Sequence, residues 1–350
     1  MKSASLKAVS AAALAACLAG PAIAHHSRAN FDMETEVDFT GTVTEFSWRN
    51  PHVYAVVEGI GANGEMETRT YEMNSTTVLM RFGWNRGDLT AGEHVTIRGN
   101  PDRDASKNFY YTTVVVKEDG SELWSWGEGV KRAPAAPVPP STDFTGVWTF
   151  APEGGFNPLG LDRPDDVQRE TDLPLNEAGE AMFADFDPSE EPSFNCEPPT
   201  LPGIAGQPYP SRITRLDEDT LEIAYEVDNA RRTVHLDMDE HPADLEPSPL
   251  GHSIGHYTDD GGLIVDTVGF APSVWGHDQS VDSSDQKHVV EQFELLDGGR
   301  RYRNTMTITD PAYLTEPYER SYTYAQFGGY ELQDYTCDLE TARRHLTVGE

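Results

Sequence analysis

The chain has 350 residues, of which 59 are acidic and 26 are basic, so its formal net charge at pH 7 is −33. This length favours two domains, because one domain usually holds about 100–200 residues. The acidic excess excludes nucleic acid and anionic membrane surfaces as partners, since both are bound through Lys and Arg side chains that neutralise phosphate. A metal ion or a small molecule is the expected partner, and the sequence indicates no oligomeric state.

The N-terminus has the layout of a secretory signal peptide. Two lysines precede an apolar run, and the small residues GPAIA, which end at Ala24, offer a cleavage site. We therefore expect residues 1–24 to be removed and the mature protein to be periplasmic or secreted. The alternative is that the motif LAAC, which ends at Cys17, is a lipobox, and processing there would leave a lipoprotein anchored through Cys17.

The cysteine count depends on that cleavage. Of Cys17, Cys196 and Cys337, only the last two remain once the signal is lost. An even pair in an oxidising compartment predicts a Cys196–Cys337 disulfide. The alternative is two buried thiols. A two-cysteine zinc site is less favoured, because neither cysteine has a Cys or His close to it in the sequence.

Residues 25–130 predict a small β-barrel domain. The expected elements are strands at 37–48, 53–58, 67–71, 92–99 and 110–117, with a helix at 75–82. A hairpin turn falls at 61–64, and Ser75 is placed to cap the helix. Three strands, a helix and two further strands are the order of an oligonucleotide/oligosaccharide-binding (OB) barrel.

Residues 131–142 form a proline-rich linker, because four prolines within 134–140 cannot pair in a sheet or continue a helix. Residues 143–350 predict a second domain, also mainly β. Its expected strands lie at 212–216, 220–227, 232–237, 252–257, 263–268, 288–295, 302–310 and 322–327. One helix is expected at 176–186, capped by Asn176. A meander of this kind, opened by Gly-x-Trp at 146–148, predicts a lipocalin-like up-and-down β-barrel.

Several short motifs add a resemblance. In the first half they are AHHS at 24–27, NPH at 50–52 and GNP at 99–101, and in the second half CEPP at 196–199 and GHSIG at 251–255. The stretch from about 24 to 120 resembles a family of exported bacterial proteins of unknown function. The second half resembles another uncharacterised exported domain. Neither resemblance implies an activity.

The new N-terminus is the most specific chemical feature. Cleavage after Ala24 makes His25 the first residue, and its α-amine and imidazole can chelate one metal ion. His26 adds an imidazole, and His52 is the best candidate for a further nitrogen because Pro51 stiffens its loop. His94 is the alternate. The alternative interpretation, without metal binding, is that two polar histidines are present only because they are compatible with cleavage of the signal peptide.

This nitrogen set resembles the histidine brace of copper monooxygenases and copper chaperones. Low-coordinate nitrogen ligands suit copper, which also has the highest affinity of the divalent series, and zinc is the natural competitor. We therefore expect an exported metal-binding protein, with copper favoured, that carries or senses metal rather than turning over a substrate.

Two alternatives use the second domain. A periplasmic enzyme could draw an acid–base site from His252, His256, His288 and Glu291. A carrier of a small apolar molecule could line its cavity with Trp148, Arg232, Phe270 and Trp275. The alternative interpretation, without a function, is that the evenly spaced His252 and His256 face solvent from one side of a strand.

Overall fold

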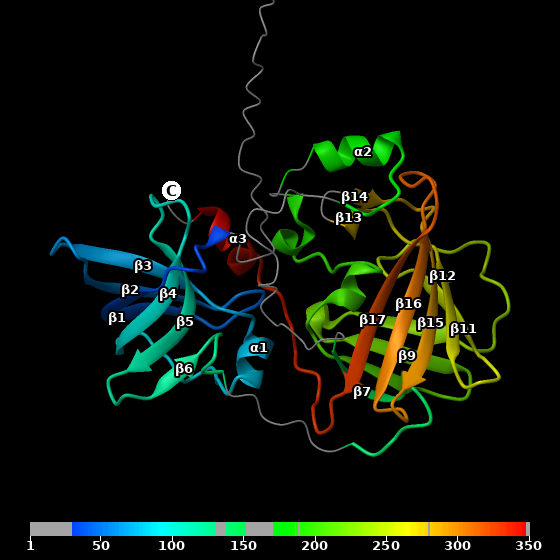
Figure 1. The fold of residues 1–350 in the computed structure, drawn as a ribbon, viewed down its shortest axis with the longest axis horizontal. Coiled ribbons are helices and arrows are strands. Elements are labelled where there is room, and N and C mark those ends of the chain that lie inside the picture. Colours follow the sequence, from blue (N-terminus) through cyan, green and yellow to red (C-terminus); the bar gives the residue numbers. More distant parts are fainter. Residues whose placement is uncertain are drawn as a thin grey trace, which may run out of the picture.

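The computed structural model describes residues 30–130, 138–151, 171–185, 187, 190–278 and 281–347. The chain forms two β-barrels that lie side by side, each around its own hydrophobic core (Figure 1). The predicted fold class, mainly β with a small OB-like barrel before a larger one, is confirmed. Within these residues no helix is long and apolar enough to cross a bilayer.

The first barrel has the predicted order of elements. They are β1 (Val37–Ser47), β2 (Tyr54–Ile60), β3 (Met66–Glu72), α1 (Thr76–Arg81), β4 (His94–Pro101), β5 (Phe109–Lys117) and the short β6 (Glu122–Trp124), which was not predicted. The sheet runs β3-β2-β1-β4-β5-β6, and a parallel pairing of β3 with β5 closes it. In β1, Phe39 and Val43 point inward between exposed polar residues, as the period of two requires. The Ser75 hydroxyl caps α1 by accepting from the Val78 amide.

The second barrel is larger and also closes through one parallel pair. Its strands are β7 (Gly146–Phe150), β8 (Ser211–Arg215), β9 (Thr220–Tyr225), β10 (Arg231–His235), β11 (His252–Tyr257), β12 (Leu263–Val268), β15 (His288–Leu296), β16 (Arg301–Thr309) and β17 (Tyr318–Gln326). They close in the order β10-β11-β12-β15-β16-β17-β7-β8-β9. Only β10 and β11, among these described strands, pair in parallel, and the connection 236–251 joins them. The up-and-down topology is therefore correct apart from this pair.

Shorter elements surround the second barrel. They are α2 (Glu177–Ala184), η3 (Pro192–Asn195), η4 (Gly203–Gly206), η5 (Val227–Asn229), the hairpin of β13 (Ser273–Asp278) with β14 (Val281–Ser283), and α3 (Leu339–Thr347). Asn176 caps α2 as predicted, since its side chain accepts from the amides of Ala178 and Gly179. The hairpin β13–β14 was not predicted. Residues 131–137 of the expected linker lie outside the described residues.

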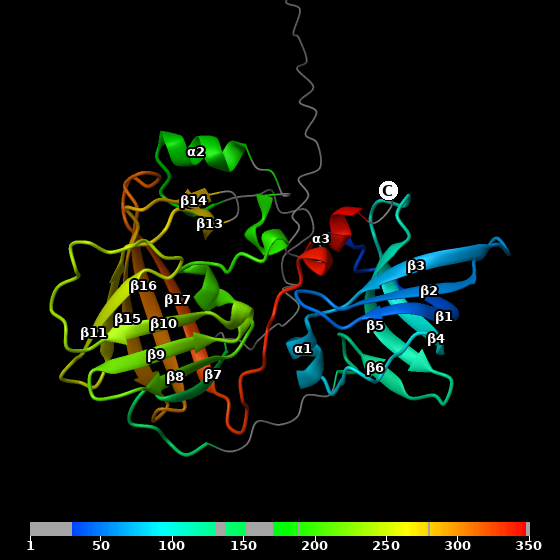
Figure 2. The same cartoon turned by 180° about the vertical axis from the view of Figure 1, so that it is seen from behind.

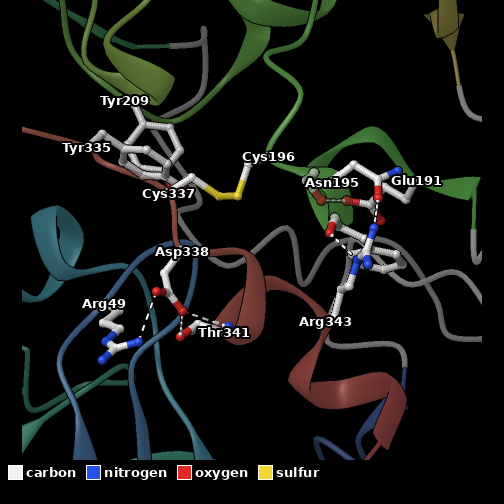
Figure 3. Close-up of a disulfide and its surroundings, with 12 residues drawn as sticks. Arg49, Glu191, Asn195, Cys196, Tyr209, Tyr335, Cys337, Asp338, Thr341 and Arg343 are labelled. Carbon is white, nitrogen blue, oxygen red and sulfur yellow. Dashed lines mark hydrogen bonds and ion pairs between the residues drawn. A yellow bond between two sulfur atoms is a disulfide. The ribbon is translucent and has the colours of Figure 1, made fainter.

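The predicted disulfide is confirmed. Cys196 follows η3, Cys337 precedes α3, and the bond joins positions 141 residues apart, with their Cα atoms 5.7 Å apart. Figure 3 shows that Asp338, the residue after Cys337, is paired with Arg49 of the first barrel, so the cross-link lies close to where the two barrels meet.

A buried ion pair lies inside the second barrel. Arg232 and Glu291 point inward from β10 and β15 and are bonded through both guanidinium Nη atoms, with Nη2 3.2 Å from Oε1. Asn304 of β16 donates to the same Oε1 at 2.8 Å. The Glu291 carboxylate therefore links three strands of the barrel wall, β10, β15 and β16. Its buried charge is compensated by Arg232 and by the hydrogen bond from Asn304.

Replacing Glu291 by Ala should destabilise the second barrel by about 3–5 kcal/mol, because it leaves a buried guanidinium without its counter-charge. The double variant Arg232→Met/Glu291→Leu should cost less than either single truncation, since it removes both charges and keeps the volume. Chemical denaturation of Glu291→Ala, Arg232→Ala and the double variant measures this order. A double variant as unstable as the singles would contradict it.

Candidate metal centre

His52 is held by a buried carboxylate. It lies two residues before β2, and its Nδ1 is 2.8 Å from Oε1 of Glu72, the last residue of β3. The His52 side chain is 43% exposed, whereas that of Glu72 is 9% exposed. The hairpin register explains this contact, because Tyr54 pairs with Glu72 across β2 and β3 and so places the chain before Tyr54 beside the carboxylate.

Tyr54 completes this arrangement from inside the barrel. Its hydroxyl donates to Glu72 Oε2 at 3.1 Å, while His52 Nδ1 contacts Oε1, so both carboxylate oxygens have a polar partner. Burial, followed by the charge of Glu72, raises the pKa of Tyr54 well above its ordinary value, which keeps the phenol protonated as a donor. Glu72 is thereby fixed in position, and it fixes the His52 ring in turn.

The short contact between His52 Nδ1 and Glu72 Oε1 is compatible with a proton on Nδ1. When His52 Nδ1–H donates to Glu72, the lone pair of the neutral imidazole is on Nε2. A histidine that binds metal through one nitrogen commonly donates its other N–H to a carboxylate, which orients the ring and raises its basicity. His52 therefore has the supporting contact of a metal ligand.

The other predicted ligands of the first barrel are placed differently. His25 and His26 lie outside the described residues. His94 is exposed at the start of β4, where it pairs with Thr42 of β1, whereas Tyr54 beside His52 pairs with Ser47. Five strand positions separate the two, or roughly 17 Å at about 3.4 Å per residue. The structure therefore does not bring His94 to His52.

A second histidine cluster lies on the outer wall of the other barrel. His241 Nε2 and His288 Nε2 both contact Asp266 Oδ1, at 3.0 and 2.9 Å. His241 Nδ1 lies 2.9 Å from His252 Nδ1, and the ring of His235 stacks on that of His252 with centroids 5.0 Å apart. The sequence analysis named His252 and His288 of this cluster but missed His241, which lies in the irregular connection 236–251.

The predicted acid–base residues are divided by the barrel wall. His252 and His288 belong to the outer cluster, while Glu291 faces the interior with Arg232. His256 is exposed toward the other end of β11, where it pairs with Ile264 rather than with the Val268 that faces His252.

The predicted cavity residues also separate. Trp148 is buried inside the barrel, with its ring centroid 4.7 Å from that of Tyr302, and Arg232 is paired with Glu291 there. Phe270 is buried beneath the Lys287 ammonium, 4.5 Å from the ring centroid. Trp275 belongs to the separate hairpin β13–β14.

No group of three or more His, Cys, Asp or Glu residues, within the described ranges, is arranged to hold a metal ion by itself. A metal at His52 would therefore need ligands from outside those ranges, and the expected partners His25 and His26 lie there.

Comparison with known proteins adds one match. Residues 13–110 match the model of a family of unknown function (DUF6152). This fits the resemblance of the first half to an uncharacterised family. The matched stretch includes His25, His26, His52 and His94 and excludes the second barrel's cluster. No curated protein and no solved structure matches the chain.

The outer cluster should make stability depend on pH. Burial, then the nearby His235 and His241, lowers the pKa of His252 below its ordinary value of 6.5. Near and above pH 6.5 His252 is neutral in both the folded and the unfolded chain, and the folded state keeps its full stability. As the pH falls below 6.5 and through the lowered pKa of the folded state, stability is lost, because the unfolded chain binds the proton on His252 more tightly than the folded chain does.

Replacing His252 by Asn should therefore flatten the loss of stability below pH 6.5. Denaturation curves collected from pH 8 to pH 5 measure it, and NMR titration of the imidazoles gives the direction of the His252 pKa shift directly. His256→Asn, on the same strand but outside the cluster, is the matched control and should keep the wild-type pH dependence. A His252 pKa at or above 6.5 would refute this prediction.

Proposed function

We propose that this is an exported metal-binding protein that holds a transition metal ion, copper favoured, through the mature N-terminal His25, with His26 and His52. The observation that carries the proposal is the contact between His52 Nδ1 and the buried Glu72. A carboxylate in this position is the supporting contact that orients a metal-binding imidazole and raises its basicity.

Chain length allows the N-terminus to reach this place. Phe31 packs against Phe109, with ring centroids 5.2 Å apart, and Phe109 stacks at 6.4 Å on Tyr54, whose ring is 6.4 Å from that of His52. His25 precedes Phe31 by six residues, which can span at most about 20 Å. A segment of this length is long enough to reach from Phe31 to His52.

The chemistry of the donor set favours copper. The α-amine and imidazole of His25 with a second imidazole would offer nitrogen ligands only, and copper has the highest affinity of the divalent series for such a set, with zinc as the competitor. The net charge of −33 raises the local concentration of any cation, but only an organised set of nitrogens selects one. We propose carriage or sensing of the metal as its use.

Substitution of His52 by Ala should lower the affinity of the processed protein for copper by at least about tenfold, because one nitrogen ligand is lost. Glu72→Gln should lower it by about tenfold, at the mild end of the 10–100-fold range for supporting carboxylates, since the amide oxygen still accepts Nδ1–H but carries no charge. Competition titration against a copper chelator of known affinity measures both.

His94→Ala is the matched control, because it removes an exposed imidazole from the same barrel and should leave the affinity unchanged. Intact mass of the exported protein establishes whether His25 is the first residue. One additional residue before His25 should weaken binding as strongly as loss of His52, because it displaces the chelating α-amine. Copper affinity that survives both the extension and His52→Ala would overturn the proposal.

A further inference from the structure

The second domain reaches over to the His52 site. After β17 the chain leaves the larger barrel, and residues 328–347, here called the C-terminal strap, run to the smaller one and end in α3 (Figure 2). The strap contacts the loop that contains His52 and the ring that supports Glu72.

The loop contact lies two residues before His52. Cys337 forms an isolated parallel β-bridge with Asn50, and the Asp338 amide donates to the Asn50 carbonyl at 2.9 Å. Arg49 Nη1 lies 2.9 Å from Asp338 Oδ2, an ion pair seen in Figure 3. The side chain of Asn50 is itself buried, and its oxygen accepts from the amide and hydroxyl of Thr76. The backbone leading to His52 is thus held from the strap on one side and from α1 on the other.

The second contact comes from α3. Arg344 forms a two-point ion pair with Glu45 of β1, with Nη2 3.0 Å from Oε2. Its guanidinium carbon also lies 5.2 Å from the centre of the Tyr54 ring. The hydroxyl of Tyr54 donates to Glu72, which holds His52. Arg344 therefore touches the innermost member of the chain of contacts that orients the imidazole.

The strap is also bonded to the segment around η3 of the larger barrel. Cys337 is bonded to Cys196, and the Arg343 Nε donates to the Phe194 carbonyl of η3 at 3.2 Å (Figure 3). Asp338 also caps the start of α3, because its Oδ1 accepts from the Thr341 amide at 2.9 Å. The disulfide thus lies one residue from the ion pair with Arg49 and at the start of the helix that carries Arg344.

We propose that the C-terminal strap positions His52, with Arg344 and Arg49 as positioning residues, and that the Cys196–Cys337 bond completes this arrangement after export. The consequence for metal affinity rests on the proposed function. The two thiols lose two protons and two electrons to a disulfide oxidant of the compartment into which the protein is exported, and the oxidant's own disulfide is reduced to two thiols by thiol–disulfide exchange. The site is then fully ordered only where that oxidant is present.

Two sets of variants of the full processed chain test the proposal. Cys196→Ser/Cys337→Ser removes the cross-link. Arg49→Ala/Arg344→Ala removes the two ion pairs between the strap and the smaller barrel with the disulfide intact, so the test survives if the serine variant fails to fold. Arg320→Ala, which breaks an Arg–Asp pair on the second barrel, is the matched control, and Arg344→Lys tests rescue.

The double serine variant and the double arginine variant should each increase amide hydrogen exchange in the segment around Asn50 and change the nitrogen chemical shifts of the His52 ring. Arg320→Ala should change neither. Copper affinity should fall by about three- to tenfold, less than for Glu72→Gln because the strap acts one contact further away. Arg344→Lys should restore part of the affinity.

The outcomes separate the two proposals. If the wild-type protein binds no copper through His52 but the exchange and ring shifts change as expected, the strap positions His52 and the metal function is wrong. If copper binding depends on His52 but none of the three readouts responds in either strap variant, the strap inference is overturned and the metal function stands.

Discussion

The closing of each sheet by one parallel strand pair is the constraint on which both candidate sites depend. In the smaller barrel, β3 pairs with β5 and places Glu72 opposite Tyr111, so that the end of β3 becomes buried and carries the carboxylate that holds His52. In the larger barrel, β10 and β11 pair in parallel, which requires a crossover rather than a tight turn. That crossover brings His241 onto the wall between His252 and Asp266.

Local sequence signals were sufficient for most of the elements. The turn at 61–64 and the caps at Ser75 and Asn176 each act within a few residues, and the hairpin and the helices appear where these signals place them. Even Glu72 had a usable signal, since the register of a hairpin turning at 61–64 sets the end of the second strand beside Tyr54. The cysteine count predicted the disulfide because the expected loss of Cys17 with the signal peptide left only one pairing.

The parallel closures and the strap could not be predicted in the same way. A parallel pair joins strands with no short connection, so its register depends on how the whole sheet curves. His241 lies in a connection with no periodic pattern, and nothing in the sequence relates it to His288. The contacts of Arg344 with Glu45 and Tyr54 span almost the length of the chain.

The scarcity of basic residues makes the position of each arginine informative. Two acidic barrels repel each other, and arginines lie where they meet. Arg81 of α1 pairs with the buried Glu226 at 3.0 Å and also donates to the Pro208 carbonyl, while Arg49 and Arg344 make the ion pairs of the strap. Exposed pairs weaken as salt screens them, whereas the pair at Glu226 is shielded because that carboxylate is fully buried.

The disulfide complements these ion pairs because salt does not screen a covalent bond. It closes a loop of about 140 residues, for which loop-closure entropy gives roughly 5 kcal/mol in the chain-entropy model. Both cysteines belong to the second half of the chain, yet Cys337 is bridged to Asn50 of the first barrel. The bond therefore limits the freedom of the strap against the larger barrel, and the strap in turn holds the smaller barrel's loop. A cross-link within one half thus fixes the relation between the halves, at the loop from which His52 extends.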